Sequence, residues 1–196
     1  IGMVGKLNNV EKAISSEWKN IHDQIWLIGS YKSEITIAAS SYLEYFHGEI
    51  TGRPPKIDLL DEKFCQSFIR NAILKSFVVS SHDISDGGLA IALAECCILS
   101  AKGATIELKK DLNRDDNLLF AEGGSRIIFS INKSKEKEWI NYLKKIKINQ
   151  ESSIYVKKIG YVSSEKLKIK IQDKNVCNLR VEELTEKFNN SISGHF

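Results

Sequence analysis

The chain has 196 residues, with 42% hydrophobic and 27% charged residues, a composition that indicates a globular protein and excludes a disordered one. The net charge of +3 is too small to indicate nucleic-acid binding, and no apolar run is long enough to cross a membrane. We expect residues 1–196 to form a single domain, with residues 189–196 frayed. Because the chain starts at Ile1 without an initiator Met, we expect it to be a fragment of a longer protein.

The first half of the chain predicts two strands and two helices. Residues 24–28 and 34–37 are strand-like and are separated by the turn residues Gly29 and Ser30, which favours a hairpin. Residues 40–47 indicate a short helix, and residues 48–55 a loop. A longer helix follows, capped by Asp58 or Asp61, with apolar residues at helical spacing: Phe64, Phe68, Ile69, Ala72 and Ile73.

The second half alternates strands and helices. A short strand at 77–80 precedes an almost wholly apolar helix at 89–99, which we expect Gly103 to end. Further strands are predicted at 104–108, 126–131, 155–162 and 167–171, and further helices at 115–120, 135–146 and 181–188. The sequence therefore predicts an α/β fold in which a mixed β-sheet is packed with helices.

The four cysteines, Cys65, Cys96, Cys97 and Cys177, have no C-x-x-C spacing, which argues against a zinc site. The adjacent pair on the apolar helix is expected to fill the core. Unpaired cysteines are typical of a reducing compartment, so we expect the protein to be cytoplasmic.

The lysines between residues 133 and 170 alternate with apolar residues and glutamates, which is typical of the solvated faces of a helix and two strands.

The run from His82 to Leu89 is the strongest candidate for a functional site, because polar residues and two glycines stand where a strand becomes a helix. A helix N-terminus attracts phosphate, and glycines let a ligand approach the backbone. Asp83 would then hold the Mg²⁺ that accompanies a nucleotide, and Ser85 would contact a phosphate oxygen. Alternatively, Ser85 or Asp86 caps the helix, and Gly87 and Gly88 only allow tight packing. Residue chemistry alone leaves both interpretations open.

Several motifs, in order along residues 1 to about 130, resemble the synthetase subunit of the phosphoribosylformylglycinamidine synthase family. The run SSHDISDGGLAIALAE resembles the family signature, and IGMVG at the start resembles a strand that leads into its final domain. Further matches are spaced residues in 42–59 and an LF-x-E-x-x-S-R block with Leu119, Phe120, Glu122, Ser125 and Arg126. The family usually has Gly-Gly-Ser-Glu where this chain has residues 38–41, Ala-Ala-Ser-Ser, which argues against a ligand at that loop.

The resemblance implies a C-terminal domain like that of aminoimidazole ribonucleotide synthetase, inside a ligase that uses ATP and glutamine to amidate formylglycinamide ribonucleotide in purine biosynthesis. It implies Mg²⁺ at Asp83 and ATP or ADP in a site shared with missing domains, with contacts from the Ser85–Gly88 turn and Arg126. The catalytic residues would lie in the N-terminal domains of the same polypeptide, so the isolated fragment would be inactive. A glutaminase subunit or domain would be a further partner, and the isolated domain could dimerise.

Three alternatives remain open at this point. The domain could be a non-catalytic scaffold of that enzyme, or it could belong to another ATP-dependent member of the same superfamily. Arg126 could pair with a phosphate or with Asp83 or Asp86, or it could form a structural salt bridge. His82 could be a general base, although a histidine beside an aspartate at a strand end is more typical of a hydrogen-bonded structural group.

Overall fold

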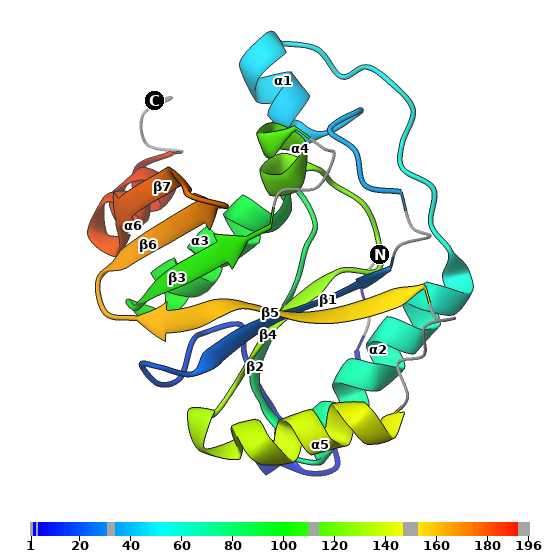
Figure 1. Cartoon of the computed structure of the whole chain (residues 1–196). Helices are drawn as coiled ribbons and strands as arrows, with labels where there is room; N and C mark the ends of the chain where they lie inside the picture. The colour runs from blue at the N-terminus through cyan, green and yellow to red at the C-terminus, as the bar shows by residue number, and fades with distance from the viewer. Residues whose placement is uncertain (1, 3, 31–33, 110–113, 147–152, 192–196) are drawn as a thin grey trace.

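The computed structural model describes all residues except 1, 3, 31–33, 110–113, 147–152 and 192–196 (Figure 1). The strands of the described part are β1 (Gln24–Ser30), β2 (Val78–Asp83), β3 (Gly103–Leu108), β4 (Ile127–Ile131), β5 (Ile154–Ser163), β6 (Lys166–Ile171) and β7 (Lys174–Arg180). Its α-helices are α1 (Ser41–His47), α2 (Leu59–Leu74), α3 (Gly88–Ser100), α4 (Asp115–Phe120), α5 (Glu136–Ile146) and α6 (Val181–Asn190). Short 3-10 helices, η1 and η2, span Val10–Lys12 and Lys133–Lys135.

The seven described strands form one sheet in the order β2-β4-β1-β5-β3-β6-β7. Neighbouring strands are antiparallel except β3 and β6, which are parallel. This arrangement confirms the predicted mixed sheet. The expected hairpin between residues 24–28 and 34–37 is wrong, because β1 pairs with β4 on one side and β5 on the other. From the second segment only Thr36 makes a β-bridge, and its partner is Glu122.

β1 lies in the middle of the fold and is buried along its whole length. Ile25 and Leu27 face a core that is completed by α3 and α6, whereas Trp26 and Ile28 face a second core under α2 and α5 (Figure 1). Successive side chains of a strand point to opposite faces, so a strand covered on both faces needs a continuous apolar run. The apolar residues of 25–28 meet this requirement.

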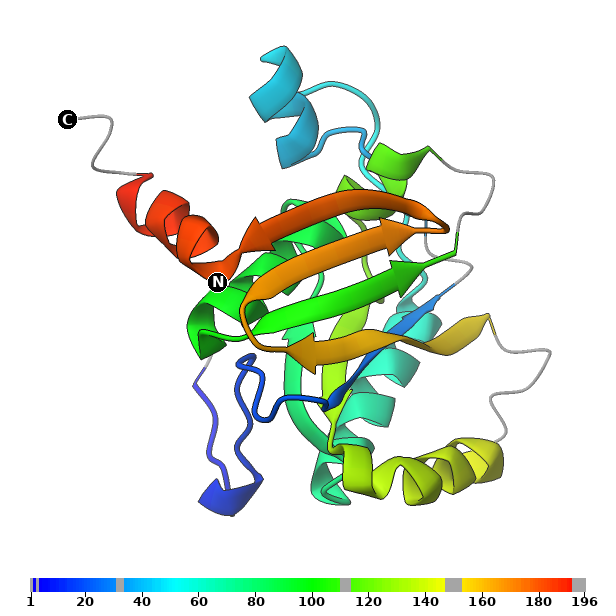
Figure 2. The ribbon, with the colours of Figure 1, turned by 60° about the vertical axis from the view of Figure 1, so that its left-hand side comes forward.

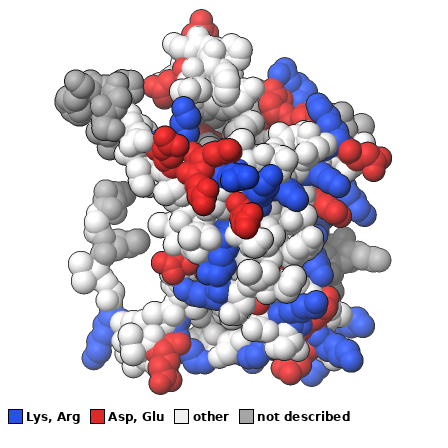
Figure 3. All heavy atoms as spheres, turned by 90° about the vertical axis from the view of Figure 1, so that its left-hand side faces the viewer, with Lys and Arg blue, Asp and Glu red and all other residues white. Residues whose placement is uncertain are grey.

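The other end of the sheet is covered on one face only. In β6, Leu167, Ile169 and Ile171 are buried, and the alternate residues Lys168 and Lys170 are exposed. Figure 2 shows the uncovered face of β3, β6 and β7. On the side seen in Figure 3, basic and acidic side chains lie beside one another. These lysines therefore lie on a solvated strand face, as the alternation predicts.

The helix ends agree in part with the predicted caps. Asp58 caps α2, accepting hydrogen bonds from Leu60 and Asp61 N–H at 3.0 Å each. The prediction that Gly103 ends α3 is wrong, because Ala101 is the C-cap with φ 51° and Gly103 already belongs to β3. The strand at 174–180 was not predicted. None of the helices in the described part combines the length and apolar character needed to cross a bilayer.

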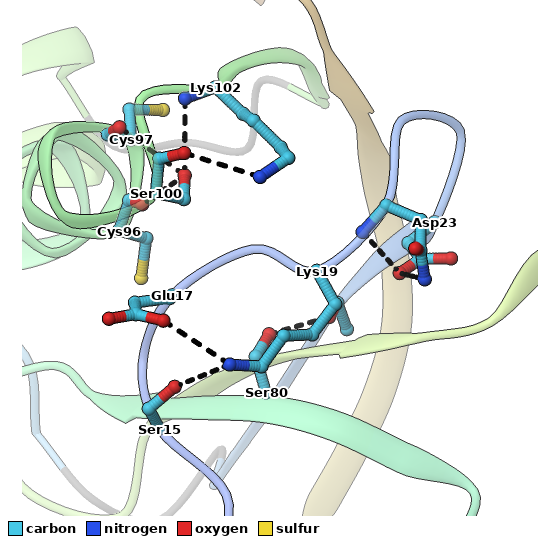
Figure 4. Close-up of polar contacts among 11 residues, drawn as sticks. Ser15, Glu17, Lys19, Asp23, Ser80, Cys96, Cys97, Ser100 and Lys102 are labelled. Atoms are coloured by element: carbon cyan, nitrogen blue, oxygen red, sulfur yellow. Dashed lines mark hydrogen bonds and ion pairs between the residues drawn. The ribbon is translucent and has the colours of Figure 1, made fainter.

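The segment before β1 belongs to the fold although it forms no strand. Trp18 is 1% exposed and packs in the core that contains α3. The Ser15 carbonyl accepts a hydrogen bond from Ser81 N–H at 3.1 Å and so covers the outer edge of β2. Lys19 Nζ lies 2.8 Å from Ser15 Oγ and 3.3 Å from Glu17 Oε2 (Figure 4). This segment shields a sheet edge that would otherwise be open.

The described residues at both ends of the chain differ from the predicted secondary structure. At the start, Gly2, Val4 and Gly5 form no strand, and Ile1 and Met3 lie outside the described residues. At the other end, α6 continues to Asn190, two residues beyond the predicted helix end. Of the rest of the segment expected to fray, Ser191 is the C-cap of α6 and residues 192–196 lie outside the described residues.

Candidate functional site

The candidate site is the turn between β2, which ends at Asp83, and α3, which begins at Gly88. The side chain of Asp83 is 76% exposed, and Ser85 and Asp86 are also exposed. Gly87 and Gly88 are buried beneath them. The turn thus presents two carboxylates and one hydroxyl to solvent, as the motif predicts.

Two residues of the 122–126 block hold the backbone of this turn. Ile84 N–H donates to the Arg126 carbonyl at 3.1 Å, and Gly87 N–H donates to Glu122 Oε1 at 2.8 Å. A third hydrogen bond, from Gly88 N–H to the Ser85 carbonyl at 3.1 Å, closes the turn on itself. The two motifs, which the sequence separates by about 35 residues, therefore form one structural unit.

The glycines are required by conformation and packing. Gly87 and Gly88 have φ values of 74° and 69°, in the left-handed region that favours glycine. A Cβ on Gly88 would lie 2.7 Å from the Phe120 carbonyl carbon and 2.8 Å from the Ala121 oxygen. Tight packing against the end of α4, one of the two interpretations of the glycine pair, therefore explains Gly88 without a ligand.

The N-terminus of α3 has no side-chain cap. Its N-cap is Gly87, and neither Ser85 nor Asp86 caps the helix, so the alternative that one of them is the cap is wrong. The Glu122 carboxylate reaches the helix start from another segment instead and accepts the Gly87 N–H. Negative charge is favourable there because of the helix dipole. A phosphate at this turn would therefore lie beside a carboxylate that already uses one of the N–H donors.

Arg126 is 5% exposed and points into the protein. Its Nη2 donates to the Ala121 carbonyl, and its buried Nε has no partner in the described part of the chain. Burial lowers the pKa of the guanidinium below its ordinary value. One of the open alternatives, an ion pair with Asp83 or Asp86, is absent among the described residues. Arg126 instead supports the loop that holds the turn.

His82 bridges two carboxylates next to the turn. Its Nδ1 lies 3.3 Å from Asp83 Oδ1, and its Nε2 lies 3.0 Å from Glu95 Oε2 in α3. The imidazole is largely buried, with 17% of its side chain exposed. This arrangement agrees with the expected hydrogen-bonded structural group. It also explains why the apolar helix α3 contains a single glutamate. The only sign of the His82–Glu95 contact in the sequence is that Glu95 interrupts an apolar run.

The adjacent cysteines of α3, Cys96 and Cys97, fill the core as predicted. Cys65, Cys96 and Cys97 are buried free thiols, and Cys177 is partly buried. Burial raises the pKa of Cys65 and of Cys97 to about 12.

Within the described residues, no group of three His, Cys, Asp or Glu side chains is arranged to hold a metal ion. Any Mg²⁺ at Asp83 would need further ligands from the nucleotide, water or another domain.

Two surface grooves lie away from the turn. One, of about 570 Å³, lies between the end of α2 and α5 and is lined by residues that include Phe77 and Tyr142. The other, of about 740 Å³, follows α6 and is lined by residues that include Glu165 and Thr185. Neither groove is lined by Asp83, Ser85 or Asp86. The exposed side chains of the candidate site therefore lie outside both of these grooves.

Comparison with known proteins gives a consistent set of relatives. The family model "AIR synthase related protein, C-terminal domain" matches residues 20–171. Phosphoribosylformylglycinamidine synthase subunit PurL of Prochlorococcus marinus strain MIT 9312 is 86% identical over 196 residues, which are all of this chain and 25% of that protein. The same subunit from strain MIT 9313 is 41% identical over 200 residues, covering 98% of this chain and 25% of that protein. The chain thus spans about a quarter of the length of these relatives.

Solved structures support the fold. Thermotoga maritima PurL complexed with FGAR has a TM-score of 0.69 at 15% identity, covering 90% of this chain and 30% of that chain. T. maritima PurL complexed with ATP has a TM-score of 0.67 at 14% identity, covering 90% and 28%. At such identity the likeness concerns the fold, and it agrees with the mixed sheet described above.

Proposed function

Since this chain belongs to the AIR synthase related protein C-terminal domain family, we propose that it is the C-terminal domain of a phosphoribosylformylglycinamidine synthase. The observation that carries the proposal is 86% identity to a PurL subunit over the whole chain. The parent enzyme would use ATP and glutamine to convert formylglycinamide ribonucleotide to its amidine. The domain would work in the cytoplasm, consistent with its free cysteines.

Within that enzyme, the turn from Asp83 to Gly88 would form one wall of a nucleotide site. The exposed Asp83 carboxylate would hold Mg²⁺, and the Ser85 hydroxyl would donate to a phosphate oxygen. Mg²⁺ prefers hard oxygen ligands and is often held by only one or two carboxylates together with phosphates and water, so a single exposed aspartate fits. When bound, the ion would neutralise phosphate charge. Asp86 would border the site, and Gly87, Gly88 and Arg126 would shape it from beneath.

The remaining parts of the reaction would come from outside this chain. The catalytic groups would lie in the N-terminal domains, since the chain spans only a quarter of its relatives. A glutaminase subunit or domain would supply ammonia, which would displace the phosphorylated amide oxygen of the substrate. The exposure of Asp83, Ser85 and Asp86 supports a site that another domain completes.

A second candidate function is a scaffold that packs against those domains and binds no nucleotide. It is favoured by large apolar side chains that are exposed on α1 and at the start of α2. Tyr45 and Phe46 are 83% and 62% exposed, and Leu59 and Leu60 are 77% and 79% exposed. On α1 the exposed rings of Tyr45 and Phe46 contact each other and would suit packing against another domain. The two functions are compatible, but only the first requires the exposed polar side chains of the turn.

The test uses the full-length parent protein with Asp83→Ala and Ser85→Ala, and Asp173→Ala and Ser164→Ala as controls. Asp173 and Ser164 are exposed residues in strand connections remote from the turn. We expect the first pair to lose bound ADP, counted after denaturation, and the control pair to retain it. Unchanged nucleotide content in both pairs would leave the scaffold as the function of this domain.

A further inference from the structure

Glu122 joins three segments that are distant in the sequence. Its backbone exchanges two hydrogen bonds with Thr36, at 2.9 and 3.1 Å. Its Oε1 accepts from Gly87 N–H at 2.8 Å and from Ser41 N–H at 3.0 Å. Gly87 is the N-cap of α3 and Ser41 is the first residue of α1. One carboxylate oxygen therefore ties the starts of two helices together.

The position of these bonds matters for the candidate site. The turn is held near its start by the bond from Ile84 N–H to the Arg126 carbonyl, and at its end by the bond from Gly87 to Glu122. Between these two anchors Ser85 and Asp86 are exposed. A short turn that is fixed at both ends has few alternative conformations, so its side chains remain aimed in one direction.

We propose that Glu122 is a positioning residue that fixes the turn from Asp83 to Gly88 in the conformation that binds a magnesium nucleotide. This inference rests on the proposed function. In the described structure Glu122 is hydrogen-bonded to the turn through the Gly87 backbone, so it would act on the ligand through the turn. If the turn adopts its binding conformation in only a fraction of molecules, the apparent affinity falls by that fraction. Charge-assisted hydrogen bonds of this kind are about twice as strong as neutral ones.

The chain contains a matched control in Glu62. Its Oε2 accepts from Ser125 N–H at 2.7 Å and from Ser125 Oγ at 2.9 Å, so it also makes two hydrogen bonds to the 122–126 block. Glu62 comes from α2, however, and makes no contact with the turn in the described structure. Its loss should destabilise the same loop without releasing Gly87.

The experiment compares Glu122→Ala, Glu122→Gln, Glu62→Ala and Asp83→Asn in the full-length protein. Mg-ADP affinity is measured by titration, and hydrogen exchange is measured on peptides that span residues 83–91. We expect Glu122→Ala to weaken Mg-ADP binding about tenfold and to speed exchange at the turn. Glu122→Gln keeps an oxygen acceptor, so it should restore most of the affinity. Glu62→Ala should bind Mg-ADP like the unmodified protein.

The outcomes separate failure of the inference from failure of the proposed function. If Asp83→Asn weakens binding but Glu122→Ala does not, the positioning role is refuted and the nucleotide site stands. If Asp83→Asn leaves binding unchanged, the nucleotide site is refuted and the positioning role for it is refuted as well. Equal weakening by Glu122→Ala and Glu62→Ala would show general loosening of the loop, which also refutes the specific role of Glu122.

Discussion

Two glycines with nearly the same positive φ allow the packing at the turn to be measured. Gly48 and Gly88 have φ values of 68° and 69°. A Cβ on Gly48 would meet no atom within 4 Å, whereas one on Gly88 would lie 2.7 Å from backbone carbon of Phe120. Gly48→Ala and Gly88→Ala therefore both place an L-residue at a positive φ, and only Gly88→Ala adds a steric cost.

The expected losses follow from these two contributions. A left-handed conformation costs an L-residue about 1–2 kcal/mol, and the reduced freedom of the unfolded chain offsets about 0.4–1 kcal/mol of this. Gly48→Ala should therefore destabilise the fold by about 1 kcal/mol. Gly88→Ala adds an overpacking cost of about 1–3 kcal/mol, because the neighbouring atoms are backbone and cannot rotate away. Its total loss should be about 2–4 kcal/mol.

The measurement is urea unfolding of both variants, followed by far-ultraviolet circular dichroism and analysed from the transition midpoints. Each variant is compared with the unmodified chain under the same conditions. If both variants lose the same stability, then the end of α4 can move away from α3 at no cost. That result would contradict the interpretation that close packing, and not ligand approach, requires glycine at position 88.

Three further predictions concern the rest of the fold. Ala101 has φ 51° at the C-cap of α3, so Ala101→Gly should raise the free energy of unfolding by about 0.5–1 kcal/mol, and an unchanged urea midpoint would contradict the assigned conformation. Trp18 is 1% exposed, so Trp18→Ala should lower the free energy of unfolding by about 3–5 kcal/mol, even though Trp18 lies before the family match that begins at residue 20. A decrease below about 1 kcal/mol would show that the fold does not need this segment. Burial raises the pKa of Cys65 and Cys97 to about 12, so the folded state keeps these thiols protonated where the unfolded state loses its protons. This contribution to stability should be fully present below the ordinary thiol pKa and fall as pH rises from about 9 towards 12, by up to about 1.4 kcal/mol per pH unit for each thiol. Urea unfolding at several pH values measures this loss. Cys65→Ala or Cys97→Ala should make the loss of stability with pH smaller.

Local patterns in the sequence predict much of the fold. The apolar helix after the His82–Gly88 run, the cap at Asp58 and the alternation in β6 each depend on neighbours within a few residues, and all three are present. β7 escaped prediction because its sequence, KNVCNLR, is polar and mostly exposed at the sheet edge, so no strand-like alternation marks it. The hairpin prediction failed because the partners of β1 come from residues 127–131 and 154–161, far along the chain.

The sequence by itself determined the family, the α/β class and the place of the candidate turn, because motifs, apolar periodicity and glycine punctuation are local properties of the chain. Only the tertiary structure decided which of the turn residues face solvent, why Gly88 must be glycine and what Arg126 and Glu122 do. The two hydrogen bonds to the Glu122 carboxylate, for example, join residues 35 and 81 positions apart. A single sequence does not encode such distances in any local pattern, since they arise only when the sheet brings the segments together.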